Sequence, residues 1–229
     1  MPKSKIALPA AHHIQDTKPA RPKRDGARTR DAILRAAIDE FAEHGFSGAR
    51  IERIVNRAVT NMRLVYFHFA SKEELYFAVL EAVYADIRAQ ERALDLEALE
   101  PHEAIRRFID FTITHFLNNP AFLKLTTYEN LLGGRTVAGS DAIARMSSPL
   151  IATIRRILDR GRAAGLFRRD VDALQFYISI VALSCHHLNN VHTLSATFQA
   201  DLAAPEWLAA RAAHIREMLL SYLEWGNAR

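Results

Sequence analysis

The chain has 229 residues, of which 49% are hydrophobic and 24% are charged, so it is long enough to bury one or two sizeable cores. Segments rich in Ala, Leu, Arg and Glu dominate and no run of alternating β-branched residues is present, which predicts an all-α protein. The single cysteine, Cys185, excludes an intramolecular disulfide and zinc sites of the CxxC type. No apolar run is as long as a membrane span and residues 1–15 lack the apolar core of a signal peptide, so we expect a cytoplasmic protein.

Positive charge is concentrated near the N-terminus. Residues 1–72 carry 14 Lys or Arg and 7 Asp or Glu, whereas the other 157 residues carry 16 and 19. A basic end on a near-neutral remainder is typical of a nucleic-acid-binding protein, although a basic tail that only keeps the chain soluble would give the same balance. Residues 1–26 are rich in Pro and Lys and are predicted to be a disordered basic tail, either an arm along DNA or an uninvolved segment.

The first expected helix covers residues 28–44. Ile33, Ala37 and Phe41 follow one another at intervals of four residues, so they share one face of a helix, and this face is expected to be buried. Gly45 follows, and glycine is the residue that most often ends a helix. This segment therefore predicts an amphipathic helix that packs against the elements after it.

Two shorter helices are expected next, at residues 49–58 and 62–69. Val59-Thr60-Asn61 separates them, and Asn61 is suited to cap the second of the two. Ser71-Lys72-Glu73-Glu74 then has the spacing of a capping box at the start of a longer helix. Two short helices joined by a tight turn predict a helix-turn-helix, whose second helix enters the major groove of DNA.

The segment from Ile54 to Leu75, IVNRAVTNMRLVYFHFASKEEL, resembles the pattern I-A-x-x-A-G-V-S-x-G-x-L-Y-x-H-F-x-S-K-E-x-L of TetR-type transcriptional regulators. The residues that match it are Ile54, Ala58, Tyr66, His68, Phe69, Ser71, Lys72, Glu73 and Leu75. Upstream, residues 33–46 resemble the first helix of that family and the turn after it. The chain departs from the pattern where Val59-Thr60-Asn61 replaces Gly-Val-Ser and where Arg63 replaces a later Gly. The resemblance implies a DNA-binding domain followed by a larger helical domain that binds a small molecule and dimerises.

Side chains on the exposed side of the helix at 62–69, and beside it, are predicted to contact DNA. We expect Arg63 and Met62 to face base edges, whereas Tyr66 and His68 hold phosphates. Lys72 is expected to bind a phosphate at the start of the next helix, where backbone N–H groups also point toward an anion. The predicted DNA-binding residues are Arg50, Thr60, Asn61, Met62, Arg63, Tyr66, His68 and Lys72.

Three parts are predicted along the chain: the tail at residues 1–26, the helix-turn-helix domain at 27–72, and a helical effector-binding and dimerisation domain at 73–229. A helix from Ser71 to about Leu94 is expected to link the last two parts. The further helices are expected at residues 101–118, 121–132, 140–164, 171–190 and 206–225, with a polar stretch between the last two. The prediction is thus of about nine helices.

The last two expected helices are predicted to bind a second copy of the chain. Residues 174–188 are hydrophobic nearly all round, so both sides should be covered. The last helix carries two adjacent apolar stripes, one for its own core and one for a partner. The resemblance implies a four-helix dimer interface here, and its predicted residues are Val181, His214, Met218 and Trp225. A two-fold dimer would present two recognition helices about 34–36 Å apart, or somewhat more, to an inverted-repeat operator.

The resemblance also implies an effector pocket among the fourth to eighth helices. Aromatic side chains with a few polar groups suit a small, partly polar aromatic ligand, although aromatic residues at helical spacing are also ordinary core. The predicted lining is Phe111, His115, Phe116, Phe122, Tyr128, Glu129, Asn130, Phe176, Tyr177 and His187. Tyr128 and Asn130 are expected to orient the ligand. The stretch at residues 129–135 further resembles the C-terminal domains of nicotinate-pathway repressors.

A helical enzyme or a metal-binding protein is the interpretation from a different class. Cys185, His186 and His187 are adjacent, but neighbouring residues of a helix point about 100° apart and do not face one another. No P-loop, GxSxG or HExxH motif accompanies them, so we predict no enzyme, no cofactor and no metal. The predicted function is a homodimeric repressor of a neighbouring operon that a small effector releases. The alternative is a regulator whose second domain binds a protein partner or no ligand.

Overall fold

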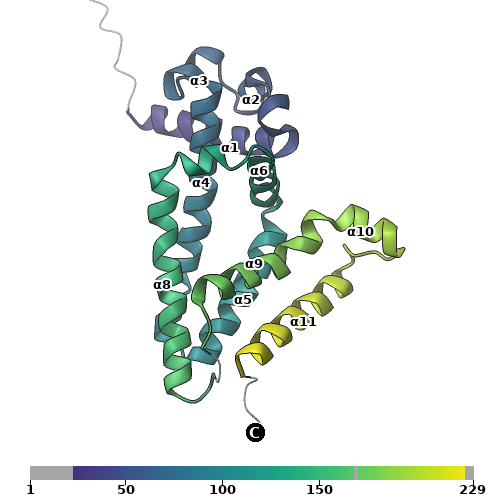
Figure 1. Ribbon diagram of the computed structural model, residues 1–229. Helices are drawn as coiled ribbons and strands as arrows, with labels where there is room; N and C mark the ends of the chain where they lie inside the picture. Colours follow the sequence, from purple (N-terminus) through teal and green to yellow (C-terminus); the bar gives the residue numbers. More distant parts are fainter. Residues whose placement is uncertain (1–22, 168–169, 225–229) are drawn as a thin grey trace, which may run out of the picture.

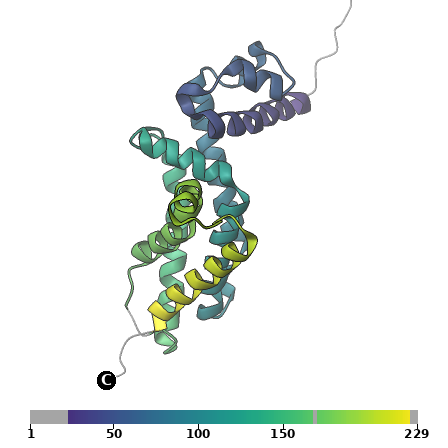
Figure 2. The same ribbon diagram turned by 90° about the vertical axis from the view of Figure 1, so that its right-hand side faces the viewer.

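The computed structural model describes residues 23–167 and 170–224, and these residues form helices and connecting turns without a strand (Figure 1). The prediction of an all-α protein is therefore confirmed. The first four helices are α1 (Lys23–Gly48), α2 (Ile51–Arg57), α3 (Met62–His68) and α4 (Lys72–Ala93). Helices α1 to α3 gather at one end of the molecule, and α4 runs from that end into the larger remainder (Figures 1 and 2).

The larger remainder is also helical. Its elements are the 3₁₀ turn η1 (Leu96–Ala98), α5 (Pro101–Asn118), α6 (Pro120–Leu131), α7 (Arg135–Ala138), α8 (Asp141–Ala163), α9 (Ala173–Asn189), α10 (Val191–Phe198) and α11 (Pro205–Glu224). Within the described residues this makes eleven α-helices, two more than predicted. The short helices α7 and α10 account for the difference, since neither is long enough to show a helical repeat of apolar residues.

Helix α1 begins earlier than predicted. Residues 23–26 were assigned to the disordered tail, but they form the first turn of α1. Once a helix is nucleated, each further residue adds one hydrogen bond at little cost, and the Ala and Arg residues that follow favour helix. The tail therefore ends at least four residues sooner than the prediction, and residues 1–22 lie outside the described part of the chain.

Helices α1 to α3 share one core with the start of α4. Ile33, Ala37 and Phe41 are fully buried on the face of α1 that the sequence predicted. Their cluster continues through the buried side chains of α4 and takes in Leu125 of α6 and Ile143 of α8. The two predicted domains are therefore joined by continuous apolar packing as well as by α4.

Side-chain caps fix the starts of α3 and α4 where the sequence predicted them. The side-chain oxygen of Asn61 accepts a hydrogen bond from the Leu64 N–H at 3.0 Å. The Ser71 hydroxyl accepts one from the Glu74 N–H at 3.1 Å. Each cap satisfies a backbone donor that the first turn of a helix leaves without a partner. The orientation of α3 is thus set by local chemistry at both of its ends.

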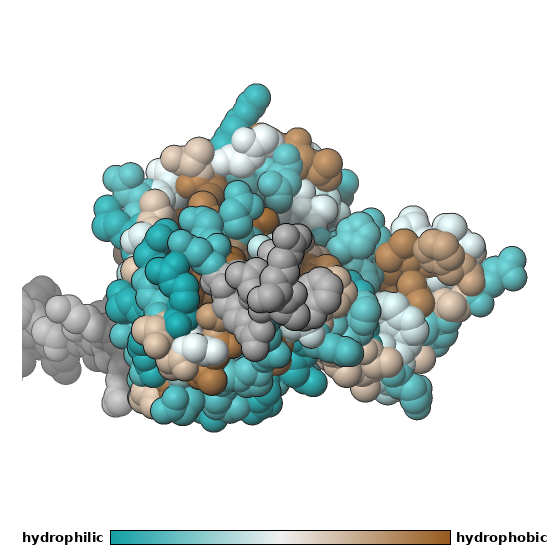
Figure 3. Space-filling view, turned by 60° about the horizontal axis from the view of Figure 1, so that its bottom comes forward, coloured by the Kyte–Doolittle hydropathy of each residue, from teal (hydrophilic) through white to brown (hydrophobic). Residues whose placement is uncertain are grey.

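A second core lies at the far end of the molecule and joins α5, α8, α9 and α11. Phe108, Ile154, Ile180 and Ile215 are each at most 1% exposed within it. Helix α10 projects sideways from the body (Figure 1), and the corresponding lobe at the right of Figure 3 shows apolar surface. Phe198 at the end of α10 is 68% exposed. The second domain thus has a complete core of its own and leaves apolar surface outside it.

Two properties of the described residues bear on the other function classes. Within residues 23–167 and 170–224, none of the helices combines the length and the hydrophobicity that crossing a bilayer requires. In the same part of the chain, no three His, Cys, Asp or Glu side chains are grouped as metal ligands would be.

Candidate functional site

Helix α3 presents one face to its own domain and another to solvent. Val65 is buried, whereas Met62 is 40% exposed, Tyr66 is 47% exposed and Arg63 is exposed. Within the described residues, the Arg63 guanidinium takes part in no hydrogen bond or ion pair. A cation without an internal partner on an exposed short helix is available to base edges or phosphates.

Phe67 is an exposed aromatic residue that the sequence analysis did not select. It is 77% exposed and stacks edge-on with the ring of His68, with 5.1 Å between ring centroids. The position is variable in the family pattern, so the pattern carried no signal for it. Phe67 comes two residues after the buried Val65 and so points to the opposite side of the helix, and a large apolar residue there was the available indication that this face of α3 binds something.

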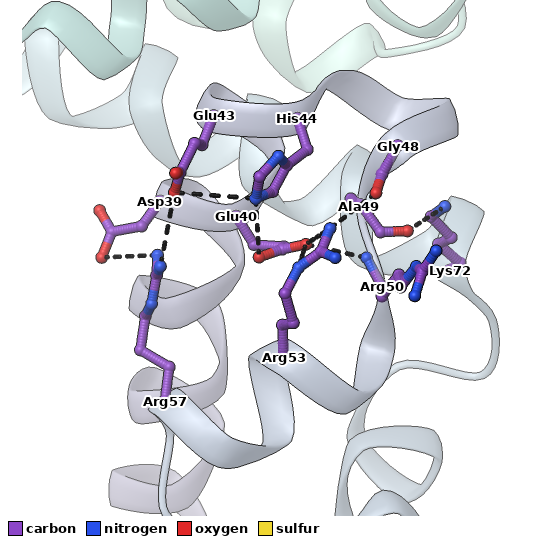
Figure 4. Close-up of polar contacts among 10 residues, drawn as sticks. All are labelled: Asp39, Glu40, Glu43, His44, Gly48, Ala49, Arg50, Arg53, Arg57 and Lys72. Carbon is purple, nitrogen blue, oxygen red and sulfur yellow. Dashed lines mark hydrogen bonds and ion pairs between the residues drawn. The ribbon is translucent and has the colours of Figure 1, made fainter.

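Lys72 and Arg50 flank α3, but their settings differ (Figure 4). The Lys72 ammonium donates to the Ala49 carbonyl oxygen at 2.7 Å and lies 4.9 Å from the centre of the Phe46 ring. It therefore joins the start of α4 to the connection before α2, and two of its three N–H donors remain for a phosphate. The Arg50 side chain is exposed, whereas its backbone N–H is held inside the domain.

The group that holds the Arg50 N–H is the carboxylate of Glu40, a residue on α1 with a side chain only 1% exposed. The Glu40 Oε1 atom accepts from the Arg50 N–H at 2.9 Å and from the Arg53 Nε–H at 2.7 Å (Figure 4). Arg53 also donates to the Gly48 carbonyl oxygen at 2.7 Å. Burial alone would raise the pKa of Glu40, but the hydrogen bonds from Arg53 and from the Arg50 N–H outweigh it and hold the pKa below its usual value. One buried carboxylate thus fixes α2 against α1.

The turn between α2 and α3 contains a strained residue. Val59 has a φ of 49° and is 92% exposed. A β-branched side chain rarely adopts this left-handed conformation, and the pattern noted above has glycine at this position. The change of residue has therefore kept the turn and left Val59 under conformational strain.

In the second domain, the ten predicted lining residues do not share one cavity. Tyr128 packs against Gly45, where an added Cβ atom would lie 3.0 Å from the Tyr128 ring. The buried carboxylate of Glu129 accepts from the Tyr76 hydroxyl and from the backbone N–H groups of Thr136 and Val137. Asn130 is exposed, and its amide donates to the Thr126 carbonyl oxygen. These three lie where α6 meets α1, α4 and α7, and of them Tyr128 also lines a cavity that Phe116 borders.

Four other candidates form an aromatic cluster between α5 and α6. The rings of Phe116 and Phe122 stack with centroids 5.9 Å apart, and His115 lies 6.0 Å from Phe122 and 5.5 Å from Phe111. Burial lowers the pKa of His115. The packing is close, so this cluster serves as a wall or as core.

The last candidates lie on α9. Phe176 is buried in the far core, and the Tyr177 hydroxyl accepts a hydrogen bond from the Arg88 Nη2 at 2.9 Å. His187 faces α11, with its ring 5.5 Å from that of Trp207. Burial and the nearby Arg211 lower the pKa of His187.

Arg88 and Glu91 form a buried ion pair that the sequence analysis did not select. Both side chains are at most 5% exposed, with 2.7 Å between the Arg88 Nη1 and the Glu91 Oε2. They border a cavity of about 220 Å³ between α4 and α8. Burial raises the pKa of Glu91 to about 7, although Arg88 and Arg92 act in the opposite direction. This pair gives the second domain its buried charged site.

The predicted dimer residues are not equally accessible. His214 and Met218 are exposed on α11, with 45% exposure for Met218. Val181 is partly buried against a small cluster inside the same chain. Trp225 lies outside the described residues. Leu174 and Ile178 of α9, about half exposed, are the apolar side chains that this helix leaves uncovered.

Comparison with known proteins assigns the two halves of the chain. Residues 33–79 match the family described as bacterial regulatory proteins, tetR family, and residues 101–219 match the tetracyclin repressor-like C-terminal domain. The chain belongs to the TetR family of transcriptional regulators. Its family and relatives are regulators and not enzymes.

Several TetR-family relatives cover much of the chain. The HTH-type transcriptional repressor NicS of Pseudomonas putida is 37% identical over 77% of this chain and 83% of its own length. The HTH-type transcriptional regulator RutR of Escherichia coli is 34% identical over 44% of this chain and 48% of its own length. Among solved structures, the transcriptional regulator SCO4942 of Streptomyces coelicolor has a TM-score of 0.62 at 26% identity, covering 83% of this chain and 96% of its own. The suspected membership is thus confirmed.

Membership explains which residues the sequence revealed. The TetR-family pattern covers α3 and the start of α4, and the caps that the sequence predicted at Asn61 and Ser71 are present. The pattern does not cover Glu40, Arg53, Arg88 and Glu91, and two of their contacts, Glu40 with Arg53 and Arg88 with Tyr177, join different helices. The available signal was a charge within an apolar helical stripe, since Glu40 follows Ala36, and Glu91 follows Ile87, by four residues.

Proposed function

We propose that this TetR-family regulator is a homodimeric repressor that binds an inverted-repeat operator and is released by a small effector. The exposed face of α3, with the unpartnered Arg63 guanidinium and the Asn61 cap at its start, is the observation that carries the DNA part of the proposal. The proposal that this regulator represses transcription, and does not activate it, rests on the relative NicS, which is described as a repressor. A regulator whose target is bacterial DNA acts in the cytoplasm, and we propose a neighbouring operon as its target.

Arg63 and Met62 are proposed to read base edges, with Thr60, Asn61, Tyr66 and His68 on the backbone around them. The Asn61 side-chain oxygen is used in the cap, which leaves its amide N–H groups for a phosphate. Arg50 and Lys72 flank this surface. Guanidinium groups pair with the O6 and N7 atoms of guanine, so a guanine is the base expected opposite Arg63.

The DNA part is tested by fluorescence anisotropy with a labelled fragment of the promoter region beside the gene. Arg63→Ala should weaken specific binding by about 1–3 kcal/mol and relax the preference at one base pair. Lys72→Ala should weaken binding to all sequences alike and flatten the salt dependence by about one unit. Equal affinity of the wild-type protein for the promoter fragment and for unrelated DNA would refute specific operator binding.

The dimer is proposed to form through α9 and α11. Leu174 and Ile178 leave apolar surface on α9, and Met218 leaves it on α11. Ile178→Asp would bury an unpaired charge in such an interface, which is strongly unfavourable, so this variant should be monomeric in light scattering. Ser179→Asp is the matched control, because Ser179 is exposed and points away from Ile178. A wild-type monomer at micromolar concentration would contradict the dimer.

The effector is proposed to bind among α4, α5, α8 and α9, and to change the tilt of α4 and so the distance between the two recognition helices. Tyr128, Glu129 and Asn130 are not part of this proposed pocket, because their side chains serve the contact of α6 with α1, α4 and α7. A tenfold loss of operator affinity needs only about 1.4 kcal/mol of coupling. Substrates of the enzymes encoded beside the gene should release the DNA in the anisotropy assay. If none does, the regulator with a protein partner or no ligand is favoured.

A further inference from the structure

The buried pair of Arg88 and Glu91 is incompletely satisfied. The Arg88 Nη2 donates to the Tyr177 hydroxyl, but the Nε–H has no partner within the described residues. The Glu91 Oε2 lies 2.7 Å from the Arg88 Nη1 without the geometry of a hydrogen bond. Buried polar groups are usually paired, because an unpaired one carries its full desolvation cost. Two such atoms in one ion pair indicate a site that a ligand completes.

The donors of Arg88 suit a carboxylate. The Nε–H and one Nη2–H lie on the same edge of the planar guanidinium, which is the edge that accepts a carboxylate with two parallel hydrogen bonds. The Tyr177 hydroxyl accepts from Nη2, so its own hydrogen remains for donation to an anion. Arg88 therefore pairs with one carboxylate of the protein, that of Glu91, and still has N–H donors for a second carboxylate.

The cavity next to the pair sets the size of the ligand. Its volume of about 220 Å³ is below the range of drug-sized pockets, which begins at roughly 300 Å³. Apolar walls come from Leu96 after α4 and from Met146, Pro149 and Leu150 of α8. The charged residues at its opening, Arg92, Asp95 and Glu97, are exposed and screened by solvent. A single ring with one carboxylate fits this combination of a buried cation and an apolar wall.

We propose that Arg88 binds the carboxylate of a small monocyclic acid in the cavity between α4 and α8, and that the ligand displaces Glu91 from Arg88. The inference rests on the proposed function, because it names the chemical class of the effector. Both residues belong to α4, the helix that begins beside α3, and the opposite wall belongs to α8. Binding therefore acts on the contact between the two helices that lie side by side in Figure 1.

The protonation of Glu91 gives the site a characteristic pH dependence. Its pKa is raised to about 7 by burial, with Arg88 and Arg92 of α4 acting against this. The groups that face the pair from other elements are the Tyr177 hydroxyl of α9, His115 of α5 and Thr153 of α8, together with Asp95 and Glu97 after α4. Protonated Glu91 no longer competes for Arg88, so a carboxylate ligand should bind about tenfold more tightly at pH 6 than at pH 8.

Thermal unfolding of the full chain tests this inference with benzoate, nicotinate and cyclohexanecarboxylate, each beside its neutral amide. At one hundred times its Kd, a carboxylate should raise the Tm by about 5 °C or more, and its amide should not. Glu91→Gln should bind the same acid about tenfold more tightly at pH 8 and lose the pH dependence. Arg88→Gln combined with Glu91→Gln should abolish the shift without leaving a buried unpaired carboxylate. Arg145→Gln is the matched control and should keep the shift, because Arg145 is an exposed residue of α8 that does not line the cavity.

The inference is overturned if no carboxylate raises the Tm, if amides act as well as acids, or if the variant without Arg88 responds like wild type. Operator binding is measured separately, by anisotropy without ligand. A protein that binds the operator but no carboxylate retains the proposed function and loses only this inference. A protein that binds the acid through Arg88 but has no specific DNA target loses the proposed function and keeps the site.

Discussion

Glu40 in the DNA-binding unit and Glu91 in the second domain are both buried carboxylates, yet the protein holds them in different ways. Glu40 receives the Arg50 N–H and the Arg53 side chain on one oxygen, and only its other oxygen lacks a close donor. Glu91 pairs with Arg88, and its oxygen that faces Arg88 accepts no well-formed hydrogen bond. The pKa is accordingly lowered for Glu40 and raised for Glu91.

This difference suits Glu40 to a structural role and suits the pair of Arg88 and Glu91 to the binding of a ligand. A carboxylate that accepts backbone and guanidinium donors fixes the relative position of two helices, as Glu40 does for α1 and α2. A buried ion pair with donors left over contributes little to stability by itself and has a geometry that another anion can enter. We therefore expect a single arrangement of α1 and α2 around Glu40. For Arg88 we expect two, one in which it pairs with Glu91 and one in which it pairs with a ligand.

The largest effect is expected when the carboxylate of Glu40, which holds α2 against α1, is removed. Glu40→Ala deletes two hydrogen bonds to a charged group and leaves the Arg50 N–H unpaired, so unfolding free energy should fall by about 3–4 kcal/mol in urea titrations. Specific DNA affinity should fall with it, because α2 is no longer held. Glu40→Gln keeps one acceptor oxygen and should lose less. A loss below about 1 kcal/mol for Glu40→Ala would mean that this carboxylate contributes no more to stability than a carboxylate in an exposed ion pair.

The second test uses pH on the other carboxylate. A carboxyl group whose pKa is higher in the folded state favours folding only while it is protonated, so the contribution is present below the unfolded value of 4.5 and is lost as the pH rises through about 7. Wild type should therefore lose roughly 3 kcal/mol of stability relative to Glu91→Gln between pH 4.5 and pH 8. Glu40, with a lowered pKa, contributes in the opposite direction and loses its effect in acid. A constant difference between wild type and Glu91→Gln across this range would contradict the raised pKa.

Sequence reasoning located the parts of the fold that depend on neighbours in the chain. The caps at Asn61 and Ser71 act over three residues, and the buried face of α1 follows from a four-residue interval, so all of these were predictable. The longer helices were placed to within a few residues for the same reason. The start of α1 and the two short helices α7 and α10 were not predicted, since no pattern in the sequence marks them.

The proposed effector site could not be located in the same way, because the contacts that decide which candidates can line it form only in the folded chain. Tyr128 lies against Gly45, and Arg88 binds Tyr177, over separations of more than eighty residues. An aromatic residue at helical spacing has the same pattern whether it lines a pocket or packs in a core. A charge at an apolar stripe position is more informative, because burial obliges it to find a partner, and Glu91 is such a residue.

The turn before α3 differs from the rest of the DNA-binding unit, because its backbone is strained at Val59. Val59 holds a φ of 49°, which glycine adopts without strain, so Val59→Gly should raise the unfolding free energy by about 1 kcal/mol once the greater freedom of glycine in the unfolded chain is subtracted. Val59→Asn, a residue that tolerates this conformation, should give a smaller gain. Denaturant titrations of the three proteins measure it. A loss of stability in Val59→Gly would show that the side chain, although 92% exposed, makes a contact worth more than its strain.

The smallest expected effect comes from Arg57, which lies in the same unit as Glu40 but on its surface. Its guanidinium is 3.6 Å from the Asp39 carboxylate and 3.5 Å from that of Glu43 (Figure 4), and all three side chains are more than 40% exposed. Exposed pairs at such distances gain little, because water and salt screen them and two long side chains lose freedom. Arg57→Ala should therefore keep the Tm within about 1–2 °C of wild type, although it removes two ion pairs and Arg53→Ala would remove only one. If Arg57→Ala instead destabilised the protein as strongly as Glu40→Ala, the number of ion pairs would govern this end of the molecule, and the burial of Glu40 would not explain its effect.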